Sequence, residues 1–200
     1  MDVVHKEIER RLAKSRKGQL IFLSDFRDIG SQAAIKMALS RLSAEGKIKR
    51  IAHGIYLIPK SDPVLGEVYP SMEEIAEAVA KKEQVKIKPA GAYALHKLGL
   101  TTQVPMRLVY ITDGTPRQIK IGKTTIKFKA TTRKKLALEG EISSLIVQAL
   151  EELGTKNIEP GTKQRIKELL LKEDQKKLMS DIKLAPVQIS DYLYSLLKEQ

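Results

Sequence analysis

Residues 20–59 read LIFLSDFRDIGSQAAIKMALSRLSAEGKIKRIAHGIYLIP, and this stretch decides the fold. Ser24 can cap a short helix through Arg27, Gly30 then breaks the chain, and Ser31 can cap a longer helix. Apolar residues recur at i, i+3, i+4 and i+7 in the longer segment, at Ile35, Ala38, Leu39 and Leu42. The pattern predicts a helix, a tight turn and a second helix whose apolar stripe faces a core.

Two short apolar runs follow this second helix. Gly46 stands where the helix should end, and residues 47–52 and 55–58 have the composition of strands that flank His53 and Gly54. Gly54 supplies the positive φ that a two-residue turn needs. Helix, turn, helix, glycine stop and basic hairpin in this order are typical of a winged helix-turn-helix, a module that binds duplex DNA. Residues 3–15 form an amphipathic pattern that would supply the first helix of this domain.

The face of the second helix opposite its apolar stripe combines small residues with two cations. Small side chains permit close approach to DNA, and Lys36 and Arg41 match phosphate groups or guanine edges. We expect the second helix to enter the major groove and the hairpin to contact the flanking backbone or minor groove. The predicted DNA-binding residues are Gln32, Lys36, Ser40 and Arg41 on the helix and Lys47, Lys49, Arg50 and His53 on the wing. The alternative is a solvated helix and hairpin with scattered lysines.

The net charge of +12 favours a polyanionic partner, and its distribution localises the binding surface. Residues 1–60 hold 13 Lys and Arg against 6 Asp and Glu, and residues 61–133 hold 12 against 7. Residues 134–200 hold 11 of each and are neutral. The chain has six tyrosines, three phenylalanines and no tryptophan, too few for the stacking platforms of single-strand binders. Double-stranded DNA is therefore the expected partner.

Several function classes lack their residues. The absence of cysteine excludes disulfides, a thiol nucleophile and cysteine-ligated metals. The segment Gly122-Lys123-Thr124 resembles the end of a phosphate-binding loop but is not one. Arg117 stands where that loop needs its first glycine, and the expected strands flank the segment where a helix would have to follow. The three histidines have no metal-ligand spacing. We therefore expect no enzymatic activity, no cofactor and no metal. We also expect a cytoplasmic location, because the N-terminus is charged and no apolar run is long enough to span a bilayer.

The proline- and charge-containing segment from Pro59 to Pro63 marks a boundary, so the expected domains are residues 1–60 and 61–200. Ser71 and Glu74 form a capping box that opens a helix to about Glu83. A short helix is expected at 89–98, followed by strands at 107–112, 118–121 and 125–130 in a small antiparallel sheet. Three further helices are expected, at 139–153, 162–180 and 190–198. The predicted fold class is α+β.

Two runs of sequence resemble the AbiEi-type antitoxin family of type IV toxin–antitoxin systems. The first is IKMALSRL at 35–42, with EGKI at 45–48 and GIY at 54–56; the second is KPAGAYALHKLGL at 88–100, followed by Pro105. The resemblance covers roughly residues 1–150. It implies an N-terminal winged helix that represses its own operon and a C-terminal domain that contributes to neutralising a nucleotidyltransferase toxin encoded next door.

The leading hypothesis is a non-enzymatic repressor that resembles this antitoxin, binds inverted repeats in its own promoter, and has a cognate toxin as a direct or functional partner. One alternative is a winged-helix adaptor that docks proteins without operator specificity. Another is a divergent nucleotidyltransferase-like or nuclease domain after residue 60. The middle segment offers candidates for antitoxic or additional DNA contacts, unless they are a solvated sheet face: Lys86, Lys88, Lys120, Lys127 and Lys129.

Overall fold

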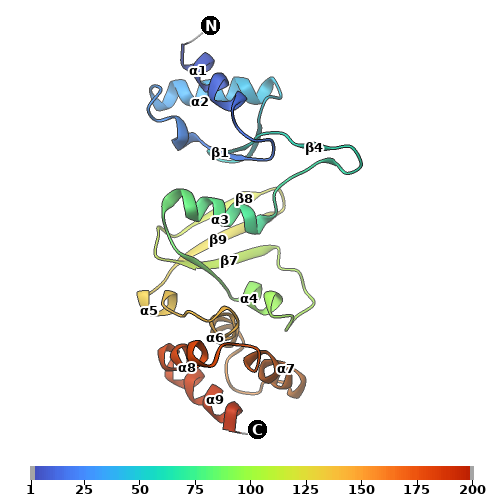
Figure 1. Ribbon diagram of the computed structural model, residues 1–200, viewed down its shortest axis with the longest axis vertical. Coiled ribbons are helices and arrows are strands. Elements are labelled where there is room, and N and C mark those ends of the chain that lie inside the picture. Colours follow the sequence, from blue (N-terminus) through green and yellow to red (C-terminus); the bar gives the residue numbers. More distant parts are fainter. Residues whose placement is uncertain (1–2, 199–200) are drawn as a thin grey trace. The chain divides into compact units, whose positions relative to one another are not determined.

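The structure is a computed structural model that describes residues 3–198 (Figure 1). The chain divides into two compact units between Ala78 and Val79. Both units combine helices with small sheets, so the predicted α+β class is confirmed. Within residues 3–198, no helix has the length and apolar character needed to cross a membrane.

The N-terminal unit has the element order of a winged helix. Helix α1 (Val3–Ala13) precedes strand β1 (Leu20–Phe22), the 3-10 helix η1 (Leu23–Phe26) and helix α2 (Gln32–Ala44). Strands β2 (Lys49–Ala52) and β3 (Ile55–Leu57) then form the predicted hairpin, and β1 pairs with the other side of β3. The result is a three-stranded antiparallel sheet in the order β1-β3-β2.

The caps of α2 form as the sequence predicts. The side chain of Ser31 accepts a hydrogen bond from the Ala34 amide at 3.3 Å. At the other end Gly46 has a φ of +74°, and the Lys47 amide donates to the Leu42 carbonyl at 3.0 Å. This is the glycine-terminated cap that satisfies the last carbonyls of a helix.

The first helix of the predicted helix-turn-helix differs from expectation. It is one turn of 3-10 helix from Leu23 to Phe26, and Ser24 lies inside it rather than at its cap. Asp25 supplies the capping interaction, since its carboxylate accepts from the Phe22 amide at 2.7 Å. The physical reason is that pairing of β1 with β3 holds the backbone extended up to Phe22.

One hydrophobic core supports the winged-helix elements. The apolar stripe of α2 is fully buried, as predicted, while the opposite face is exposed at every position expected there, from Ala33 to Ala44. The core joins residues from α1, β1, η1, α2 and β3 with Ile48, which precedes β2; its members are Ile8, Ile21, Phe26, Ile35, Ala38, Leu39, Leu42, Ile48 and Tyr56. Burial of this stripe fixes which face of α2 remains available to a partner.

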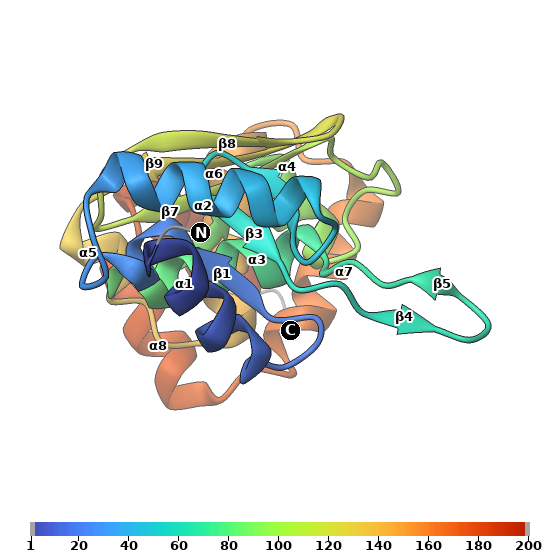
Figure 2. The ribbon, with the colours of Figure 1, turned by 90° about the horizontal axis from the view of Figure 1, so that it is seen from above.

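A small hairpin follows the wing and projects from the unit (Figure 2). Its strands are β4 (Ser61–Asp62) and β5 (Gly66–Glu67), and Asp62 accepts from the amides of Val64 and Leu65 at 2.8 and 3.0 Å. Helix α3 (Met72–Glu83) starts with the predicted capping box, in which Ser71 and Glu74 exchange hydrogen bonds of 2.7 and 3.1 Å. The β4–β5 hairpin and the first half of α3 belong to the N-terminal compact unit, which runs to Ala78.

The C-terminal unit contains a four-stranded sheet in the order β6-β7-β9-β8. Its strands are β6 (Ile87–Ala90), β7 (Arg107–Thr112), β8 (Arg117–Ile121) and β9 (Thr124–Ala130). The prediction of a wholly antiparallel sheet is wrong, because β9 inserts between β7 and β8 and runs parallel to β7. The prediction of a helix at 89–98 is wrong in its first part. Residues 87–90 form strand β6, which pairs with β7, and helix α4 covers only Ala92–Lys97.

Five helical segments follow the sheet. They are α5 (Arg133–Leu136), α6 (Glu141–Leu153), α7 (Pro160–Leu170), α8 (Gln175–Leu184) and α9 (Val187–Lys198). The single helix predicted over 162–180 is wrong, because the chain breaks after Leu170 and Asp174 caps a new helix by accepting from the Lys177 amide at 3.0 Å. Apolar faces of α4 and α6 to α9 share one core.

The N-terminus of α6 is capped by carboxylates from later in the chain. Buried Asp181 accepts from the amides of Glu139 and Gly140 at 2.8 and 2.9 Å and from the Ser143 hydroxyl at 2.5 Å. Glu173 accepts from the amides of Ile142 and Ser143 at 2.7 and 2.9 Å. Burial alone would raise the pKa of Glu173, but these backbone hydrogen bonds outweigh it and lower the pKa. The two carboxylates satisfy the free amides of the helix start.

Candidate nucleic-acid interface

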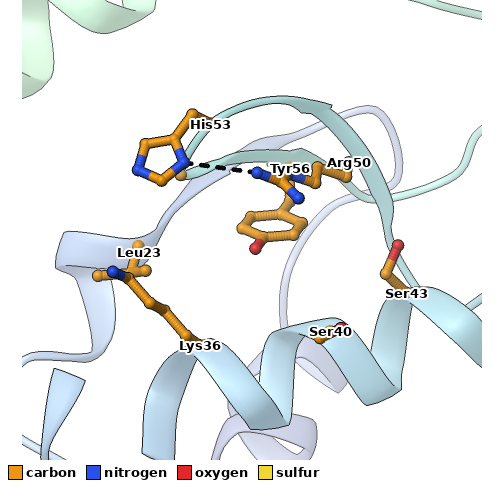
Figure 3. A pocket seen from close by; sticks show the side chains of 8 residues that line it. Leu23, Lys36, Ser40, Ser43, Arg50, His53 and Tyr56 are labelled. Atoms are coloured by element: carbon orange, nitrogen blue, oxygen red, sulfur yellow. Dashed lines mark hydrogen bonds between the residues drawn. The ribbon is translucent and has the colours of Figure 1, made fainter. Parts of the chain in front are cut away.

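A cleft of about 350 Å³ lies between α2 and the wing (Figure 3). One side of the cleft belongs to α2 and carries Lys36, Ser40 and Ser43. The other side belongs to the hairpin and η1, with Leu23, Arg50, His53, Gly54 and Tyr56. Figure 3 shows the Arg50 and His53 side chains on the wing side and the Tyr56 ring between the wing and the helix.

The cleft is electropositive on both sides. Helix α2 has no acidic residue, and neither does the segment from Lys49 to Ile58. Lys36 and Arg41 are exposed and have no ion-pair partner among residues 3–198. The Arg50 guanidinium donates to Nδ1 of His53 at 3.4 Å, which orients it at the edge of the wing while leaving its charge uncompensated. Such a surface suits the phosphates that border a DNA groove.

The structure brings together only some of the predicted DNA-binding residues. Lys36, Ser40, Arg50 and His53 line the same cleft. Gln32 and Arg41 lie on the exposed surface of α2 but do not line the cleft. Their position is compatible with contacts to a duplex that is wider than the cleft.

Two predicted wing cations are engaged within the protein. Lys47 forms ion pairs with Glu9 and, at 3.0 Å, with Glu45, and these carboxylates raise its pKa. Lys49 pairs with Glu67 of β5, which is the main reason that its pKa is raised. Lys49 also donates to the Tyr69 hydroxyl at 3.1 Å. The sequence offered no signal for this contact, because β4 and β5 were not expected.

The cleft also contains side chains that were not predicted from the sequence. Tyr56 is opposite Arg50 in the antiparallel register and therefore shares its face of the hairpin. Its ring is packed in the core, and Figure 3 shows its hydroxyl directed toward the cleft. Ser43 lies one residue before the end of α2 and adds a second hydroxyl. A regular two-residue turn at His53 and Gly54 would pair Tyr56 with Ile51. The bulge between Arg50 and Ala52 shifts the register so that Tyr56 lies opposite Arg50, and the sequence pattern gave no signal for this shift.

The two adjacent wing cations should differ in their effect on DNA binding. Replacing Arg50 by alanine should reduce the slope of log K against log salt by about one unit, the value for one lost phosphate contact. Lys49→Ala should change the slope by much less, because Lys49 is already paired with Glu67. Fluorescence anisotropy with a random duplex over a series of salt concentrations measures both slopes. Equal reductions in the two variants would contradict this assignment.

Fold and site together define a winged-helix protein whose N-terminal unit carries a basic cleft between helix and wing. The chain matches, over residues 7–178, the model of a family described as "Family of unknown function (DUF6088)", and it belongs to that family. Among solved structures it is similar to the RV2827C protein from Mycobacterium tuberculosis, with 12% sequence identity and a TM-score of 0.49. That alignment covers 99% of this chain and 77% of the other. No curated protein sequence matches the chain.

Proposed function

We propose that the protein is a non-enzymatic transcriptional repressor that binds double-stranded DNA at inverted repeats in its own promoter. The observation that carries this proposal is the cleft in which α2 and the wing present Lys36, Ser40, Arg50 and His53 together. A helix that enters the major groove and a basic wing that contacts the adjacent backbone constitute a common mode of operator binding.

The distribution of roles within the cleft follows from its chemistry. The exposed face of α2 presents Lys36, Ser40 and Arg41, whose donors can read guanine or adenine edges. Arg50 and His53 lie on the hairpin, where they reach the sugar–phosphate backbone and add affinity without reading sequence. Tyr56 and Ser43 supply neutral hydroxyl donors for phosphate oxygens.

The second part of the proposal concerns the C-terminal unit. The resemblance of the 88–100 segment to AbiEi-type antitoxins supports a role in counteracting a neighbouring nucleotidyltransferase-like toxin, directly or functionally. In this structure the segment forms β6, Gly91 and α4, and it packs against α6. Co-expression of the full chain with the adjacent toxin gene tests this role, and continued growth arrest would contradict it.

The operator proposal is tested by footprinting the full chain on the DNA upstream of its own gene. We expect protection of two half-sites separated by about one helical turn, and an affinity at least about a thousandfold higher than for a random duplex of equal length. A promoter fragment with scrambled half-sites serves as the control. Equal affinity for native and scrambled fragments would refute operator recognition. A chain that binds a protein partner but no DNA would favour the adaptor alternative.

A further inference from the structure

A second basic surface lies on the sheet of the C-terminal unit, at the β8–β9 edge. In the antiparallel register Gln118 is opposite Lys127, and Lys120 is opposite Thr125. Side chains two residues apart on a strand share a face, so Lys129 joins Lys127 on that side. The other face of β9 presents Ile126 and Phe128, which are buried. Burial of these two residues fixes the orientation of the lysines.

Arg107 completes the surface, because in the parallel register of β7 and β9 it is opposite Thr125. We use the term basic strip for Arg107, Lys120, Lys127 and Lys129. Three of these side chains are exposed and Lys127 is half-buried, and none has an ion-pair partner in the described range 3–198. The strip adjoins a depression of about 360 Å³ whose lining includes Gln118, Lys127 and Lys129.

The surrounding sequence does not neutralise the strip. From Pro105 to Leu138 the chain has one acidic residue, Asp113, and its carboxylate accepts from the Lys86 amide at 2.8 Å. Other cations of this unit serve the fold instead. Lys88 is half-buried and donates to the Leu138 carbonyl, and Arg117 lies on the opposite face, where it pairs with Glu83 at 2.5 Å.

We propose that the basic strip binds the phosphodiester backbone of duplex nucleic acid, as a second contact surface independent of the winged helix. Its lysines can hold phosphates as point charges, and this type of contact carries no sequence information. Lys127 and Lys129 are about 6.7 Å apart along β9. That spacing is close to twice the 3.4 Å rise per nucleotide of a DNA strand, so both can reach phosphates of one strand.

The composition of the strip favours nucleic acid over an acidic protein. Protein interfaces are depleted in lysine and depend on aromatic or large apolar residues that fill pockets. The outward face of β8 and β9 at this edge offers Gln118, Thr125 and three lysines, without an aromatic residue. Phe128 also lines the adjoining depression, but its side chain is buried and belongs to the opposite face of β9. The same lack of aromatic residues argues against single strands, whose binding depends on base stacking.

The test uses the full chain with the exposed cations of α2 and the wing neutralised by Lys36→Gln, Arg41→Gln and Arg50→Gln. In this background, Lys120→Gln, Lys127→Gln and Lys129→Gln are compared with a control triple, Lys156→Gln, Lys172→Gln and Lys176→Gln. The control lysines are exposed, belong to the same unit and change the net charge equally. Because these winged-helix cations are neutralised in both proteins, failure of operator recognition leaves the result of this test unaffected.

Binding of a random duplex of roughly 30 base pairs is measured by anisotropy between about 50 and 200 mM salt. The strip triple should lower the slope of log K against log salt by about 2.7, the value for three lost phosphate contacts, and the control triple should leave it unchanged. Circular dichroism melting of both proteins checks that the sheet is intact. Equal slopes in the two folded proteins would overturn the proposal. Equally tight binding of poly-L-glutamate at equal charge, or tighter binding of a single strand, would overturn the assignment to duplex nucleic acid.

Discussion

Replacing Gly140 by alanine should lower the free energy of unfolding of the C-terminal unit by about 3 kcal/mol. Gly140 precedes α6 with an ordinary φ of −71°, so the cost comes from space rather than from backbone strain. A Cβ atom there would lie 2.0 Å from the Ser143 hydroxyl, 2.7 Å from the Glu173 carboxylate and 2.9 Å from the Asp181 carboxylate. The new methyl group would displace the hydrogen bonds that cap α6 and leave buried Asp181 with fewer donors.

Hydrogen–deuterium exchange at the α6 amides measures this loss within one unit, and about 3 kcal/mol corresponds to exchange roughly a hundredfold faster. Gly161→Ala is the matched control, because nothing lies within 4 Å of a Cβ at this position in α7. Alanine there should be neutral or stabilising by up to about 1 kcal/mol. Equal exchange rates in the two variants would show that the cap at Gly140 accommodates the methyl group without loss of stability, and would contradict this prediction.

Neutralising the exposed cations of α2 and the wing should produce the largest effect on DNA binding. The triple variant Lys36→Gln, Arg41→Gln and Arg50→Gln removes three cations that lack carboxylate partners within residues 3–198. Loss of three cations from the DNA-binding surface lowers the salt slope by up to about 2.7, the value if each one neutralises a phosphate, which corresponds to up to about a hundredfold weaker binding at physiological salt. Anisotropy with the promoter fragment measures this change, and the Lys156, Lys172 and Lys176 triple again serves as the control.

The single variants separate affinity from specificity. Lys36→Gln should reduce the preference for operator over random duplex by roughly 5- to 150-fold if Lys36 contacts a base edge. Arg50→Gln should weaken binding to both duplexes equally, because its position on the wing suits a backbone contact. If the Arg50 variant lost specificity and the Lys36 variant kept it, the wing would be the part that reads bases and the helix the part that contacts the backbone.

The elements that could be predicted from sequence are those built by contacts between near neighbours. Helix α2 has its apolar stripe, the Ser31 cap and Gly46 within one segment, and the wing needs only Gly54 between two apolar runs. The residues that pair or form hydrogen bonds in these structures lie three to eight positions apart in the chain, so the local pattern carries the information. For the same reason, the Ser71 capping box and the hairpin of β8 and β9 were also predicted.

Tertiary structure alone decided the features that depend on distant residues. Strand β9, and not β8, pairs with β7. Glu173 and Asp181 cap the N-terminus of α6, which begins more than 25 residues earlier in the chain. Glu67 forms an ion pair with Lys49. A strand's apolar alternation predicts that it pairs but not with which neighbour, and a carboxylate has the same sequence signature whether it is solvated or caps a helix. The sequence by itself therefore determined the winged helix and the exposed face of α2. Packing decided which of its cations remain available, because partners brought together from distant segments leave no local pattern.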